Sequence, residues 1–155
     1  DPNIPVVWCD TGYNNYQTYE HAKKLIEDLQ LNIQIYTPNS TRGFIDVTMG
    51  LPAFNDPKHE AFTELVKLEP FRRALNAHRP DVWFTNIRVR QTALRESKNI
   101  FSYSPEGILK ISPFYFWTDE DLDDYLNQKE LAKNTEYFDP VKALKSRECG
   151  IHMIG

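Results

Sequence analysis

The chain has 155 residues, of which 22 are Asp or Glu and 18 are Lys or Arg, giving a formal net charge of -4 at pH 7. This length suits one domain with a real core, and the acidic balance argues against a general nucleic-acid binder, which is usually basic. No apolar run is long enough to span a bilayer and no signal peptide is visible, so we expect a protein of the cytoplasm.

The first third of the chain alternates between strand and helix patterns. Residues 4–9 are a short apolar run, typical of a parallel strand that is buried on both faces. A helical pattern covers residues 16–30, and residues 32–36 alternate as a second strand. This strand–helix–strand unit predicts a parallel sheet. Residues 38–57 show no clear pattern, and we expect a long loop that serves as a lid or a partner surface.

The middle of the chain predicts more helices and a third strand. Residues 58–67 and 69–77 have the patterns of two helices, with Pro70 well placed in the first turn of the second. Residues 81–85 resemble a buried strand, and a short helix is expected near residues 92–97.

Two further strands and a helix complete the prediction. Residues 100–103 and 107–111 are expected to pair around a turn, and Thr118 is expected to cap a helix that runs to about residue 127. We therefore predict an α/β fold with a doubly wound, mostly parallel sheet and flanking helices. Residues 1–155 would form a single domain.

Polar residues follow two of the predicted strands, at the strand ends where ligands bind in open parallel sheets. The turn at 10–13 offers a hydroxyl and backbone amides, and the segment at 88–91 offers guanidinium groups that match phosphate or sulfate. Each alone is more often an ordinary turn or a solvated charged face. Because both follow strand ends, we expect them to meet in one crevice, with binding residues Asp10, Thr11, Gly12, Tyr13, Arg88, Arg90, Gln91 and Arg95.

Cys149 is the candidate nucleophile, although a lone cysteine is more often a small buried hydrophobe. Lys145, Arg147 and His152 surround it in the sequence and would favour its thiolate. The terminal position predicts that residues 140–155 form a mobile catalytic tail. Cys9 lies inside the first predicted strand and is expected to be structural.

The cysteines and histidines give no reason to expect a metal. Two distant cysteines make neither a disulfide framework nor a clustered zinc site, and a reducing compartment is the simplest setting for them. The remaining histidines are spaced unlike metal ligands, namely His21, His59 and His78.

Four segments of the chain, in the same order, resemble the phosphoadenylyl-sulfate (PAPS) reductase family, which has the adenine-nucleotide alpha-hydrolase-like fold. They are residues 10–13 with Thr18 and Tyr19, residues 67–75, residues 88–92 with Arg95, and residues 148–152. Residues 107–113 and Trp117 also fit the family.

The resemblance implies a reaction in which the Cys149 thiolate attacks the sulfur of PAPS and becomes an S-sulfocysteine. Thioredoxin or glutaredoxin then releases sulfite, as part of sulfate assimilation. His152 would support the thiolate, and Lys145 and Arg147 would help to bind the substrate. Closure of the tail over the nucleotide would exclude water.

The cysteine count also implies that no iron–sulfur cluster is bound, because the cysteine pairs of the adenylyl-sulfate reductases are absent. In this family that favours the 3′-phosphorylated substrate. The family's phosphate-binding loop lies upstream of the first strand, so we expect that unit to be missing before Asp1. A homodimer is one option for the assembly.

Residues 134–140 depart from the Gly-, Asp- and His-containing segment of many reductases. This departure leaves open a different substrate, and two alternatives are kept. One is a relative that uses another activated nucleotide for sulfur transfer, and the other is a non-catalytic module that binds adenine nucleotides.

Overall fold

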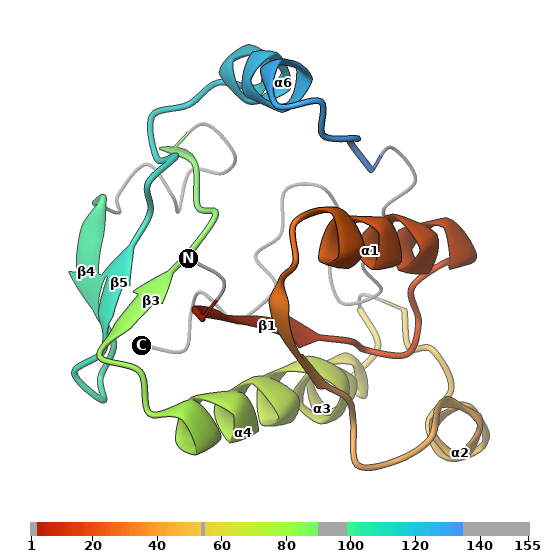
Figure 1. Cartoon of the computed structure of the whole chain (residues 1–155). Coiled ribbons are helices and arrows are strands. Elements are labelled where there is room, and N and C mark those ends of the chain that lie inside the picture. Colours follow the sequence, from red (N-terminus) through yellow and green to blue (C-terminus); the bar gives the residue numbers. More distant parts are fainter. Residues whose placement is uncertain (1–2, 54, 90–98, 135–155) are drawn as a thin grey trace. The chain divides into compact units, whose positions relative to one another are not determined.

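The structure is a computed structural model that describes residues 3–53, 55–89 and 99–134 (Figure 1). The chain divides into two compact units. The first comprises residues 1–78 and 134–143, and the second comprises residues 79–133 and 144–155. The expectation that residues 1–155 form one domain stays a prediction.

The first unit begins with the predicted strand–helix–strand motif. Strand β1 (Pro5–Cys9) pairs in parallel with strand β2 (Asn32–Tyr36), with Val7 opposite Gln34. Helix α1 (Tyr16–Asp28) connects them, and the side chain of Asn15 caps it by accepting a 2.8 Å hydrogen bond from the Thr18 amide. This part of the prediction is confirmed.

The expectation that β1 is buried on both faces is wrong for the described residues. Val6 and Val7 each remain 37% exposed, and Ile4 is exposed as well. Among those residues β1 pairs with β2 alone, in a two-stranded sheet. Side chains of a strand point to the two faces of the sheet and are buried only by what packs on those faces. The apolar run therefore indicated the strand correctly but not its burial.

The predicted loop at 38–57 contains a helix, so that expectation is also wrong in part. Helix α2 (Arg42–Thr48) begins at Thr41, whose hydroxyl accepts a 3.3 Å hydrogen bond from the Phe44 amide. Only 1% of Ile45 is exposed. A helix this short is marginal by itself, so the burial of Ile45 in the core explains why the segment is helical.

The two helices predicted at 58–67 and 69–77 are present, but they form one continuous helical segment. Helix α3 (His59–Thr63) leads through a π-helical turn (Glu64–Leu68) into helix α4 (Glu69–His78). At the end of this turn the Glu69 amide bonds to the Glu64 carbonyl, which is a bond of the wider i→i+5 type. Pro70 follows and can donate no amide hydrogen bond, so the widened turn lies where ordinary α-helical bonding would be interrupted.

The core of the first unit gathers side chains from its loop and helices. Tyr13, Ile45, Phe62 and Val66 are buried together, with Met49 and Leu65 packed against them. The rings of Tyr13 and Phe62 meet edge to face at 5.3 Å. Figure 1 shows α1 and the α3–α4 segment on opposite sides of β1, as expected when helices flank a sheet.

The second unit contains a three-stranded sheet in the order β3-β5-β4. Strands β3 (Val82–Phe84) and β5 (Leu109–Ile111) are parallel, while β4 (Phe101–Tyr103) and β5 are antiparallel. The predicted strand pair and its turn are therefore confirmed. Helix α6 (Asp119–Gln128) begins with a capping box between Thr118 and Asp121, as expected.

Together these elements confirm an α/β fold with mostly parallel strand pairs and flanking helices. The predicted short helix at 92–97 lies outside the described residues. No helix in the described parts of the chain is both long enough and apolar enough to cross a membrane.

Candidate functional site

The loop that follows β1 is organised around the carboxylate of Asp10. Its Oδ1 atom accepts hydrogen bonds from the Gly12 amide, the Asn14 side-chain amide and the Tyr19 hydroxyl, each at 2.9 Å. The Asp10 amide itself donates to the Tyr36 carbonyl at the end of β2, at 2.9 Å. The loop is thus fixed to both strands and to α1, at the carboxyl end of a parallel pair.

Thr11 and Gly12 complete the turn. The buried Thr11 hydroxyl accepts a 3.2 Å hydrogen bond from the Tyr13 amide. Gly12 adopts a φ of 78°, in the left-handed region that favours glycine. The Thr11 hydroxyl therefore serves the turn itself, and the backbone conformation explains why glycine occupies the third position of the motif.

Tyr13 lies in the core rather than in open solvent. Its hydroxyl donates a 2.7 Å hydrogen bond to Asp46 Oδ1, and the Arg42 guanidinium lies 4.8 Å from the centre of its ring. Arg42 also approaches the Gly12 carbonyl and Asp46, both at 3.5 Å. Burial, followed by the hydrogen bond to Asp46, raises the pKa of Tyr13 to about 12.

Arg42 and Asp46 were missed by the sequence analysis because they belong to the helix that was expected to be a loop. A signal was present, since Thr41 is a favourable N-cap residue directly before Arg42.

Helix α4 and the π-helical turn bring positive charge to the same end of the strands. Arg73 donates a 2.7 Å hydrogen bond to the Thr37 carbonyl just beyond β2, and it is paired with Glu69 at 2.9 Å. Lys67 is buried. Burial raises the pKa of the Cys9 thiol to about 11. The positive charges of Lys67 and Arg73 oppose this shift but do not cancel it. The Cys9 thiol is therefore protonated at neutral pH, which fits the structural role expected for it.

Arg88 is the predicted arginine that the structure describes. It follows β3 in the second unit, its side chain is largely buried, and its NH2 group lies 2.6 Å from Oδ1 of Asp119 in the first turn of α6. The neighbouring Val89 amide donates to the Tyr115 carbonyl at 2.8 Å. These contacts fix the position of Arg88 at the carboxyl end of β3.

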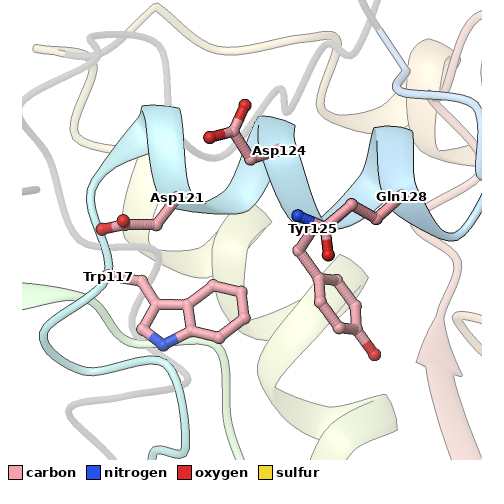
Figure 2. Close-up of a pocket in the computed structure, with 5 residues that line it drawn as sticks. All are labelled: Trp117, Asp121, Asp124, Tyr125 and Gln128. Carbon is pink, nitrogen blue, oxygen red and sulfur yellow. The ribbon is translucent and has the colours of Figure 1, made fainter.

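A depression of about 440 Å³ lies on the second unit, and none of the predicted binding residues is among the residues that line it. Figure 2 shows its lining, in which Trp117 and Tyr125 stand below the helix and Asp121 and Asp124 project from it. The two aromatic rings meet at 5.4 Å. Carboxylates and aromatic faces suit a cation better than an anion, so this depression does not replace the predicted anion site.

Several predicted residues lie outside the described residues and have no structural test. They are Arg90, Gln91, Arg95, Lys145, Arg147, Cys149 and His152. Of the predicted binding residues that the structure describes, residues 10–13 belong to the first unit and Arg88 belongs to the second. The shared crevice therefore stays a prediction. Within the described ranges, no group of three or more His, Cys, Asp or Glu residues could hold a metal ion.

These features define a class of protein, namely an α/β domain with a polar loop at the carboxyl end of a parallel strand pair, where ligands of such folds bind. Comparison with known proteins then gives the family. Residues 1–141 match the model of the phosphoadenosine phosphosulfate reductase domain, and the chain belongs to this family. The match ends before Cys149.

Curated relatives that match the chain carry the name phosphoadenosine 5′-phosphosulfate reductase. The protein from Xanthomonas axonopodis pv. citri (strain 306) is 37% identical over 131 residues, covering 84% of this chain and 54% of the relative. The protein from Xylella fastidiosa (strain 9a5c) is 34% identical over 136 residues, covering 84% and 55%. The chain thus spans about half the length of the curated relatives that it matches.

A solved structure of PAPS reductase from Candida auris, in a phosphate complex, has a TM-score of 0.72 to this chain. The two are 22% identical, and the match covers 84% of this chain and 63% of that one. At this identity the likeness supports the α/β fold, and it agrees with the class predicted from the sequence.

Proposed function

We propose that the chain acts in the reduction of 3′-phosphoadenylyl sulfate to sulfite and adenosine 3′,5′-bisphosphate, in cytoplasmic sulfate assimilation. The observation that carries this proposal is the family match over residues 1–141, together with relatives that bear the reductase name. The first unit would contribute the nucleotide-binding loop at Asp10–Tyr13.

In the proposed reaction the Cys149 thiolate attacks the sulfur of the substrate. The bond between that sulfur and the bridging phosphate oxygen breaks, adenosine 3′,5′-bisphosphate leaves, and an S-sulfocysteine remains. A thiolate of thioredoxin or glutaredoxin then attacks the Cys149 sulfur and displaces sulfite. The donor's second thiol resolves the mixed disulfide, so the donor dithiol supplies both electrons and no bound cofactor is needed.

The roles of the other residues follow from charge. Arg88, Arg90, Gln91 and Arg95 would meet the phosphate and sulfate oxygens, because guanidinium and amide groups donate to such oxygens in matching geometry. Arg88 is pre-oriented by Asp119, which lowers the entropy lost when it binds an anion. Lys145, Arg147 and His152 would stabilise the Cys149 thiolate.

The decisive experiment incubates the full chain with 3′-phosphoadenylyl sulfate and measures its intact mass. We expect a gain of one sulfonate group, located on Cys149 by peptide mapping and removed by reduced thioredoxin. Cys149→Ser should keep nucleotide binding and lose both the adduct and turnover, while Cys9→Ser should keep all of them. Sulfite production by Cys149→Ser would refute the nucleophile assignment.

The departure at residues 134–140 favours a second candidate, a relative that uses another activated nucleotide. In that case a sulfonate adduct would form slowly or persist in the presence of thioredoxin. A protein that binds adenosine 3′,5′-bisphosphate but never forms an adduct would instead be a non-catalytic binding module.

A further inference from the structure

We propose that Asp10 is a positioning residue, whose carboxylate holds the loop at residues 10–14 in its binding shape and does not itself contact the nucleotide. This inference rests on the proposed nucleotide binding by the loop. It changes the role that the sequence analysis gave to Asp10, which was that of a direct ligand.

The first argument is the convergence of three donors on a single atom. The Gly12 amide, the Asn14 side-chain amide and the Tyr19 hydroxyl all donate to Oδ1 of Asp10. Each distance is 2.9 Å, within the normal range for such bonds. Three donors on one oxygen fill its acceptor capacity, so this atom serves the protein and not a ligand.

The second argument is the origin of those donors. Gly12 and Asn14 belong to the loop, whereas Tyr19 belongs to α1, and the Tyr19 ring packs against Trp8 of β1 at 5.8 Å. Because the Tyr19 ring packs against β1, its hydroxyl is held in place to donate to the Asp10 carboxylate. Asp10 therefore ties the loop to the rigid strand and helix on either side of it.

The third argument is the backbone conformation that the loop adopts at Gly12. Gly12 has a φ of 78°, and its amide turns inward to Asp10 while its carbonyl turns toward Arg42. A loop held in one conformation before the ligand arrives does not lose that freedom on binding, which strengthens affinity. Loss of the Asp10 carboxylate should thus weaken binding indirectly, through the Thr11–Gly12 backbone.

The chemistry of asparagine separates positioning from direct contact. Because all three bonds use the same oxygen, the carbonyl oxygen of an asparagine can replace it and keep them. Alanine can keep none. A carboxylate that contacted the nucleotide through its charge or its second oxygen would lose that contact in both variants.

The test measures binding of adenosine 3′,5′-bisphosphate to the full chain by calorimetry, together with hydrogen exchange of the peptide that contains Gly12. We expect Asp10→Asn to bind within about threefold of wild type, and Asp10→Ala to bind at least about tenfold more weakly with faster exchange. Tyr19→Phe should weaken binding by about three- to tenfold, because it removes one of the three bonds. Tyr16→Phe is the matched control, since Tyr16 is exposed on the same helix and should have no effect.

A double-mutant cycle completes the test. If Tyr19 acts through Asp10, Tyr19→Phe should have no further effect in the Asp10→Ala background. The proposal is wrong if Asp10→Asn binds as weakly as Asp10→Ala, or if Tyr19→Phe leaves binding unchanged. Wild type that binds no adenosine 3′,5′-bisphosphate would contradict the proposed function instead, and the exchange data would still report whether Asp10 holds the loop.

Discussion

The hydroxyl of Tyr13 donates a 2.7 Å hydrogen bond to Asp46, 33 positions further along the chain. This bond joins the loop after β1 to helix α2, and the Arg42 guanidinium covers the Tyr13 ring beside it. The loop and the helix are therefore one packed structure, so changes in α2 should affect the candidate site.

Tyr13 gives a prediction about pH. Its pKa is raised from 10.0 to about 12, first by burial and then by the hydrogen bond to Asp46. Because the folded state favours the protonated phenol, its contribution to stability is complete below pH 10 and is lost as the pH rises toward 12. We expect the free energy of unfolding, measured by urea titration, to fall across this range. The fall should be smaller in Tyr13→Phe, and parallel pH profiles for the two proteins would contradict the prediction.

Gly12 gives a prediction about backbone strain. Gly12→Ala should destabilise the protein by about 1–2 kcal/mol, because an alanine at positive φ is strained. The nearest neighbour of an added Cβ is 3.8 Å away, so crowding is not the cause. Gly43→Ala is the matched control, since Gly43 lies in helix α2 with open space around it. That variant should be at least as stable as wild type, and an equal loss in both would argue against strain at Gly12.

Ile45 gives a prediction about the core. Ile45→Ala should reduce the free energy of unfolding by about 2–4 kcal/mol, because the residue is buried and its removal leaves a cavity. Val47→Ala, two positions away on the same helix, is the control because Val47 is 87% exposed. It should change stability by less than about 0.5 kcal/mol. Nucleotide affinity should also fall in Ile45→Ala, since α2 supports Tyr13.

Arg88 gives a prediction about binding. Arg88→Gln should weaken the binding of adenosine 3′,5′-bisphosphate by about 1–3 kcal/mol, the usual loss for a charged hydrogen bond that is no longer made. Lys24→Gln removes an equal charge from an exposed ion pair on α1 and should leave affinity unchanged. If both variants lose affinity equally, the effect is one of overall charge, and Arg88 is not a ligand.

The pattern of apolar residues predicted most of the elements. The run before Asp10 and the periodicity of residues 16–30 gave β1 and α1 nearly to their observed ends. Thr118 with the acidic residues after it predicted the start of α6, and its capping box is present. These signals are local, because capping and periodicity depend on neighbours in the sequence.

Three features could not be predicted in this way. Helix α2 depends on the burial of Ile45 against Phe62 and Val66, which are distant in the sequence. The π-helical turn at residues 64–68 has the composition of an ordinary helix. The exposure of Val6 and Val7 depends on what packs on the faces of the sheet, which the apolar run does not specify.

For the candidate site, the sequence by itself determined which residue types are available for the predicted chemistry. It singled out Asp10–Tyr13 and Arg88 after strand ends, and Cys149 in a basic setting. The tertiary structure decided what the described residues among them do: Asp10 holds a loop, Tyr13 lies in the core, and Arg88 is paired with Asp119. The physical reason is that a residue type sets which bonds a side chain can form. The partners that fold beside it determine which of them it does form.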